Sequence, residues 1–274
     1  DYEGWYIGLD FEAQCDNSND SERQLADGIC NDWIIKVSTA GKSIYSNARI
    51  MCEDLGGNYG KSTTDIDYND IVLDVTNEKS NGGNSEKVTL TLQAAGGTLP
   101  LIVTYNDNGN EYILFETHEM FAKNLDWQQK IDQGGNYSLS GVEYKTMYNT
   151  EEGTTSATPC TFVLYRNITA PSEIHKKEFK NSFDITKIGI KVYRHELEDY
   201  MSNPPHSIET SSADWISLGN QYGEAPLMIC VPSTVKWLKE RHKIDDGYPD
   251  FREWVGSPSY EFWNTKVNNT HLCE

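Results

Sequence analysis

Two acidic segments, each followed at once by an apolar run, constrain this chain more than any other feature. In the second segment, Asp65-Ile-Asp-Tyr-Asn-Asp70 leads directly into Ile71-Val-Leu-Asp-Val75, and Arg49-Ile-Met-Cys-Glu-Asp54 precedes both. Hard cations such as Ca²⁺ bind oxygen atoms of carboxylates, amide side chains and backbone carbonyls. The second segment therefore predicts a calcium site at the edge of a β-sheet.

Acidic and apolar residues alternate in this segment, which indicates the side chains that would share one face. In a strand, Asp65, Asp67 and Asn69 would point to one side and Ile66 and Tyr68 to the other. Glu53 and Asp54 follow the preceding strand and could complete the coordination of the metal from the other side of the hairpin. The expected metal ligands are Glu53, Asp54, Asp65, Asp67, Asn69 and Asp70.

Other interpretations of these acids are open. The spacing of the first ligands matches the opening of an EF-hand loop, but Asp70 stands where that loop needs Gly and Thr76 where it needs Glu. The acids could also be solvated turn residues, because Asp and Asn favour turns through local hydrogen bonds. Closely packed carboxylates repel one another and favour a cation, whereas exposed ones are screened by water and salt.

An earlier segment repeats the pattern in weaker form. Asp27-Gly-Ile-Cys-Asn-Asp32 precedes Trp33-Ile-Ile-Lys-Val37, and Gly8-Leu-Asp-Phe-Glu12 takes the place of the preceding strand. One hairpin unit used twice is expected, over about residues 8–37 and 49–75. Gly28, Ile29 and Cys30 replace oxygen donors in this copy. A weaker second metal site would use Asp10, Glu12, Asp27, Asn31 and Asp32.

Charge and composition exclude several classes of function. Among 274 residues, 42 acidic residues outnumber 23 basic ones, and the formal net charge is −19. Such a chain repels phosphate backbones, so neither a nucleic acid nor an anionic membrane surface is expected as a partner. No apolar run is long enough for a transmembrane helix. Because the sequence starts with neither Met nor a basic stretch, we expect a leader to have been removed from an exported protein.

Short strand-like segments separated by Gly and Asn turns predict one large, mainly β domain over residues 1–274. The expected architecture is a jelly-roll-like β-sandwich with a few short helices near the C-terminus. Helices are predicted at 116–122, 233–242 and 246–254. The strands are expected at 5–11, 33–37, 49–52, 71–75, 87–94, 99–105, 138–144, 161–165 and 188–193.

Cysteine and tryptophan positions give two more expectations. Six cysteines allow fifteen full pairings. A Cys15–Cys30 bridge is plausible because these residues bracket the first acidic loop, whereas the cysteines near apolar runs could equally be buried free thiols. Four tryptophans in polar stretches could form an exposed contact patch: Trp5, Trp127, Trp215 and Trp263.

Several motifs occur together in one order. The acidic motif is followed by Gln93-Ala-Ala-Gly-Gly-Thr-Leu-Pro-Leu101, His118-Glu-Met-Phe121, Met147-Tyr-Asn-Thr150 and Gly223-Glu-Ala-Pro226. In this combination, over about residues 49–263, the chain resembles the LruC-type domain of surface lipoproteins and secreted proteins of Bacteroidetes. The resemblance implies an exported, mostly β protein and supplies no catalytic residues.

The sequence favours a non-catalytic role. It contains no HExxH, GxSxG, P-loop or dinucleotide motif. We therefore expect a calcium-stabilised module of a cell-surface or secreted protein that acts in adhesion or binds an extracellular glycan or protein. The alternatives are a carbohydrate-active hydrolase with paired carboxylates and a structural envelope or fibre component. The oligomeric state is left open.

Overall fold

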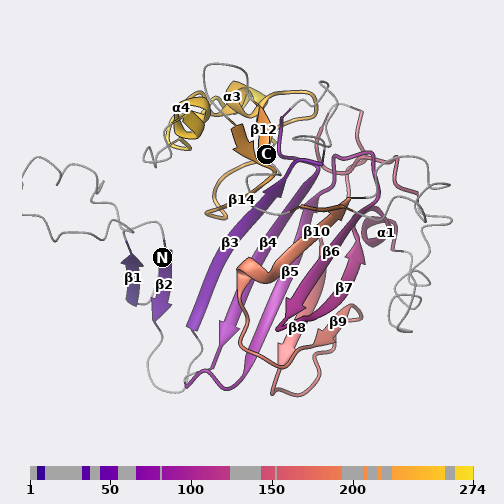
Figure 1. Cartoon of the computed structure of the whole chain (residues 1–274), viewed down its shortest axis with the longest axis vertical. Coiled ribbons are helices and arrows are strands. Elements are labelled where there is room, and N and C mark those ends of the chain that lie inside the picture. Colours follow the sequence, from indigo (N-terminus) through magenta and orange to yellow (C-terminus); the bar gives the residue numbers. More distant parts are fainter. Residues whose placement is uncertain are drawn as a thin grey trace, which may run out of the picture.

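A computed structural model describes residues 5–9, 33–37, 44–54, 66–80, 82–123, 143–151, 153–192, 206–208, 215–217, 224–256 and 263–273. Within these ranges the chain forms one large sheet, a smaller second sheet and a two-stranded pair (Figure 1). The short helices α3 and α4 lie near the end of the large sheet where β3 ends (Figure 1).

The large sheet is antiparallel except at one edge, where β8 and β9 run parallel. β14 pairs with β3 beside the main strand order. In that order, the strands are β1 (Trp5–Leu9), β2 (Trp33–Val37), β3 (Ile44–Cys52), β4 (Ile71–Lys79), β5 (Glu86–Ala94), β8 (Cys160–Arg166) and β9 (Lys176–Glu178), with β14 at Met228–Val231.

The second sheet contains β11 (His206–Ile208), β10 (Ile188–Val192), β6 (Leu101–Asp107) and β7 (Asn110–Glu116). It packs face to face on the large sheet, and β6, β7 and β10 lie over β5 and β8 (Figure 1). Phe115 of β7 and Phe162 of β8 meet across the interface with ring centroids 5.6 Å apart. The remaining pair joins β12 (Trp215–Ser217) and β13 (Glu224–Pro226).

Alternation of side chains explains why the sheets pack this way. Along β5, Val88, Leu90 and Leu92 are fully buried, while the residues between them are partly exposed. A period of two places all three on the face that packs against the second sheet.

The prediction of a mainly β sandwich with a few short helices is confirmed: the helices are α1 (Thr117–Ala122), α3 (Ile244–Gly247) and α4 (Phe251–Gly256).

The helix predicted over residues 233–242 is wrong. This segment forms turns and a single bridge between Leu238 and Leu272. Its carbonyl groups accept hydrogen bonds from distant parts of the chain, so they are not used in helical bonds to the following turn. The donors to the carbonyls of Val235, Lys236, Trp237 and Leu238 are, in order, Arg49 Nη1, Tyr248 Oη, the Cys273 amide and Asn69 Nδ2.

Aromatic side chains near the C-terminus form a buried cluster. Trp263 packs edge-on against Tyr248 and Phe251, with centroid distances of 5.2 and 4.9 Å. The expectation that Trp263 belongs to an exposed patch is therefore wrong, because burying its large apolar ring favours the core. Trp127 lies outside the described residues, and Trp5 and Trp215 lie in β1 and β12.

The described cysteines are free thiols: Cys52, Cys160, Cys230 and Cys273. Cys52 is buried and Cys230 is exposed. The predicted partners Cys15 and Cys30 lie outside the described residues. Among the described helices, none combines the length and the apolar character that crossing a bilayer requires.

Candidate metal centre

The β3–β4 hairpin brings the second acidic segment together at one end of the large sheet. Cys52 pairs with Ile71, so Glu53 follows the last residue of β3 and Asp70 immediately precedes β4. One carboxylate oxygen from each of Glu53, Asp67 and Asp70 lies within 4.8 Å of the others, and all three residues are buried. We refer to Glu53, Asp54, Asp67, Asn69 and Asp70 as the acidic cluster; Asp54 and Asn69 are buried beside the three carboxylates.

The backbone of the acidic cluster is not the strand that the alternating sequence predicts. Residues 66–70 precede β4 as an irregular segment, in which Ile66 and Tyr68 have left-handed φ angles of 58° and 55°. Tertiary contacts compensate for this unfavourable conformation. The Tyr68 hydroxyl donates to the Pro226 carbonyl at 2.6 Å, and the Ile66 carbonyl accepts from the Ile244 amide at 2.8 Å.

Backbone and amide donors hold several of the carboxylate oxygens. The Asp54 amide donates to Asp70 Oδ2 at 2.6 Å, and the Asp67 amide donates to Glu53 Oε2 at 3.2 Å. Asn69 donates from its backbone amide to Asp67 Oδ1 at 3.1 Å and from Nδ2 to Asp67 Oδ2 at 2.7 Å. These bonds orient the acids toward one another without supplying a positive charge.

Gly96 and Gly97, between β5 and β6, form one wall of the acidic cluster. A methyl group at Gly97 would lie 2.7 Å from Asp54 Oδ2 and 3.0 Å from Asp70 Oδ1. At Gly96 it would lie 2.1 Å from Asn69 Oδ1. The sequence analysis did not include these glycines in the site, although two glycines after a clear strand are a signal for close backbone approach.

One buried oxygen atom at this wall, Asn69 Oδ1, has no hydrogen-bond donor among the described residues. Asn69 is fully buried, and so is Thr150, whose Cγ2 methyl lies 3.0 Å from where a Cβ at Gly96 would be. Leaving a buried polar atom without a partner costs about 1–3 kcal/mol. An oxygen atom of this kind beside several carboxylates suits a bound cation.

The carboxyl of Asp70 shows the electrostatic effect of this arrangement. Burial raises its pKa well above the usual 3.8, and the neighbouring charges of Asp54, Glu53 and Asp67 raise it further. Arg49 on β3 is committed elsewhere, because its guanidinium binds Asp74 through Nε at 2.6 Å and Nη2 at 2.9 Å. A proton or a bound cation would relieve the repulsion between the acids.

The donor set fits a hard cation. All side-chain atoms of the acidic cluster that could ligate a metal are oxygen atoms. Oxygen ligands are typical of Ca²⁺ and not of metals bound by thiolate or imidazole groups. The sixth expected ligand, Asp65, lies outside the described residues. The weaker site at Asp10, Glu12, Asp27, Asn31 and Asp32 also lies outside them.

A buried histidine–glutamate pair lies on the other side of the glycine wall. His118, in α1, places Nδ1 2.7 Å from Glu116 Oε1 and Nε2 2.9 Å from the Gly97 carbonyl. Glu116 Oε1 also accepts from the Leu101 amide, and its Oε2 accepts from the Glu119 amide as the N-cap of α1. Glu119 adjoins His118 in the sequence, but the carboxylate that the structure pairs with His118 is that of Glu116.

Comparisons with known proteins give little support for a family. No protein-family model matches the sequence, and no curated protein matches it. Among solved structures, the crystal structure of a "Putative lipoprotein from Bacteroides ovatus" matches with a TM-score of 0.46 and 12% sequence identity. The match covers 90% of this chain and 78% of that chain. Similarity at this level does not assign a function, and the resemblance to the LruC-type domain stays a prediction.

Proposed function

We propose that this chain is an exported β-sandwich module that a calcium ion stabilises, and that it acts in adhesion or ligand binding, not in catalysis. The observation that carries the cation proposal is the buried approach of Glu53, Asp67 and Asp70 to within 4.8 Å of one another. Export and surface location rest on the composition and on the motifs shared with LruC-type domains.

The proposed ligands are the carboxylates of the acidic cluster together with Asn69 Oδ1. Calcium is favoured over magnesium because it accepts six to eight oxygen atoms in flexible geometry. Magnesium needs a near-ideal octahedron and usually keeps several water molecules, which suits a buried all-protein site less well. The fully buried Asn69 and Asp67 leave little room for such a shell.

A cation in this position would stabilise the fold by joining three parts of the chain. Glu53 and Asp54 follow β3, Asp70 precedes β4, and residues 66–69 contact the C-terminal region through the Ile66 carbonyl, which accepts from the Ile244 amide. Binding to the folded state alone, at a hundred times the dissociation constant, adds about 2.7 kcal/mol. For a chain of this size, that corresponds to a rise in Tm of roughly 5–10 °C.

The alternative of a carbohydrate-active hydrolase has weaker support. A glycosidase needs two carboxylates facing a cleft that admits the sugar, roughly 5–9.5 Å apart. The carboxylates of the acidic cluster are buried, and Glu116 is held by the His118 ring and two amides. The larger described pocket contains one carboxylate, that of Glu151.

Isosteric variants test the cation directly. In EDTA, Asp70→Asn should melt at or above the wild-type temperature, because it removes a buried like charge. In excess Ca²⁺ it should melt below wild type, because a ligand is lost, and Asp67→Asn should lose the calcium-dependent rise in Tm in the same way. The measurement is thermal unfolding of each purified variant in EDTA, then in Ca²⁺ or Mg²⁺.

Asp184→Asn provides the matched control. Asp184 is exposed and caps a short turn through the Thr186 amide, a role that Asn fulfils equally well. This variant should keep the full calcium shift. A wild-type Tm that is the same in EDTA and in millimolar Ca²⁺ would refute the cation proposal.

A further inference from the structure

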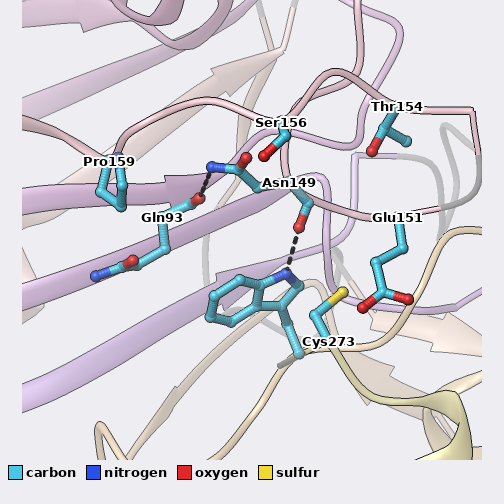
Figure 2. Close-up of a pocket in the computed structure, with 8 residues that line it drawn as sticks. Gln93, Asn149, Glu151, Thr154, Ser156, Pro159 and Cys273 are labelled. Atoms are coloured by element: carbon cyan, nitrogen blue, oxygen red, sulfur yellow. Dashed lines mark hydrogen bonds between the residues drawn. The ribbon is translucent and has the colours of Figure 1, made fainter.

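A second feature of the molecule is a pocket of about 320 Å³ between the end of β5, the loop of residues 149–159 and the C-terminal segment (Figure 2). Gln93 and Pro159 lie on one side of it, Glu151 and Thr154 lie on the opposite side, and Ser156 lies between them (Figure 2). Asn149, Trp237 and Cys273 complete the lining. The volume is at the lower end of the range for small-molecule sites, roughly 300–1,000 Å³.

The aromatic wall of this pocket is held in place. The Trp237 Nε1 atom donates to the Asn149 carbonyl at 2.9 Å, and the Arg49 guanidinium carbon lies 5.0 Å from the Trp237 ring centroid. Arg49 is itself fixed by Asp74. The indole therefore lines a preformed site and does not need to be ordered by a ligand, which lowers the entropic cost of binding.

Hydrogen bonds of Asn149 hold the opposite wall of the pocket in place. Asn149 has a left-handed φ of 60°, and its side chain binds the Gln93 carbonyl at 2.7 Å and both the amide and the carbonyl of Ala157. The bond to Gln93 attaches the loop to β5, and the two bonds to Ala157 join the two ends of the loop. The pocket is thus built by specific contacts between distant parts of the chain.

The polar groups in the pocket suit a neutral, hydroxyl-rich ligand. Glu151 pairs through Oε2 with Lys239 Nζ at 2.9 Å, which balances its charge and leaves acceptor capacity on the carboxylate. Thr154 and Ser156 add hydroxyl groups that both donate and accept. Gln93 donates from Nε2 to Asp74 Oδ2 at 2.8 Å, which fixes the orientation of its side-chain amide. The Oε1 atom of the same amide can act as a hydrogen-bond acceptor.

From this combination we infer that the pocket binds one residue of a neutral glycan. An indole offers an apolar surface to the C–H face of a sugar ring, while the carboxylate, amide and hydroxyl groups can pair with its hydroxyls. The balanced Glu151–Lys239 pair gives no net attraction for a charged ligand, and the net charge of −19 disfavours anionic sugars. The inference deepens the proposed ligand-binding role and does not require the cation.

The test uses the full chain and a panel of soluble methyl glycosides of glucose, galactose, mannose, xylose and N-acetylglucosamine. Binding is detected by saturation-transfer NMR with millimolar glycoside, and the dissociation constant is measured by titration. At least one neutral glycoside should bind. Glu151→Gln should weaken that binding by about tenfold, the cost of losing a hydrogen bond to a charged group.

A pair of variants on one loop separates pocket binding from surface binding. Ser156 and Thr158 are both exposed, but only Ser156 lines the pocket. Ser156→Trp should fill the pocket and abolish binding, whereas Thr158→Trp should bind as the wild type does. Three results would overturn the inference: no binding of any panel member, equal binding by both variants, or a preference for glucuronate over glucoside.

The calcium melt is run on the same samples so that the two proposals can fail separately. Glycoside binding without a calcium shift in Tm would refute only the cation. A calcium shift without glycoside binding would refute only the assignment of this pocket.

Discussion

The two ring nitrogens of His118 both lie within hydrogen-bonding distance of acceptor oxygens. Nε2 faces the Gly97 carbonyl and therefore donates to it, and Nδ1 faces the Glu116 carboxylate, to which it donates when the ring is protonated. Burial alone would lower the pKa of His118, but the hydrogen bond and charge of Glu116 and the Gly97 carbonyl outweigh it and raise the pKa above 6.5. The raised pKa favours the imidazolium form of His118 in this buried pair beside the glycine wall.

This pair makes stability depend on pH. Because the folded pKa is raised, its contribution is complete below about pH 6.5 and is lost as the pH rises through the folded pKa. His118→Gln should lower the free energy of unfolding by about 3 kcal/mol at pH 6, since it leaves Glu116 buried and uncompensated. That loss should shrink at higher pH, as denaturant titrations from pH 6 to 9 would show.

Glu116→Gln supplies the second test at this position. Without the carboxylate, the pKa of His118 should fall, which NMR titration of the ring protons measures. A His118 pKa that is the same in wild type and Glu116→Gln would contradict the ion pair.

At the scale of elements, the turn between β5 and β6 links the sandwich to the acidic cluster. The Gly96 amide donates to the Asn69 carbonyl at 3.0 Å, while the Gly97 carbonyl accepts from His118. Only residues without a Cβ allow the backbone to come this close to Asn69 and Asp54. The turn therefore sets the spacing between the core and the proposed cation ligands.

Gly96→Ala tests this role. The added methyl should displace Asn69, lower the free energy of unfolding by about 1–3 kcal/mol in EDTA and reduce the calcium-dependent shift in Tm. Gly109→Ala is the comparison, because Gly109 has a φ of 92° and open space around the position of a Cβ. It should cost about 1–2 kcal/mol through the left-handed backbone alone and keep the full calcium shift. An unchanged calcium shift in Gly96→Ala would argue against Asn69 as a ligand.

At the scale of the whole molecule, the net charge of −19 is a general source of repulsion. Salt screens such repulsion whether or not a specific cation is bound. In EDTA, raising NaCl from about 20 mM to 500 mM should stabilise the chain by about 1 kcal/mol, or roughly 2–4 °C in Tm. Calcium should raise the Tm at a far lower concentration than NaCl does, and the rise should reach a plateau once the site is filled. A calcium effect that simply follows ionic strength would show that the stabilisation is general screening.

Strands with a clear period of two were predictable, because burial of one face determines the pattern locally. The strand predicted at 87–94 corresponds to β5, and the one predicted at 161–165 to β8, within a residue or two at each end. The strand β7 was not predicted, although Asn108-Gly109 before it is a strong hairpin signal. Both residues have left-handed φ angles, 52° and 92°, as a two-residue hairpin turn of this type requires.

The sequence by itself determined the mainly β fold, the strands β3 and β4 at whose ends the acids stand, and the acidic net charge, since each follows from local periodicity or composition. Only the tertiary structure decided how residues 66–70 and 235–238 run, because distant donors and acceptors override their local patterns: Ile244 binds Ile66, and Arg49, Tyr248, Cys273 and Asn69 bind residues 235–238. The glycine wall, the Glu116 partner of His118 and the pocket beside Trp237 also depend on contacts between segments far apart in sequence. No pattern along one segment encodes such contacts, because their energy arises only when the chain is folded.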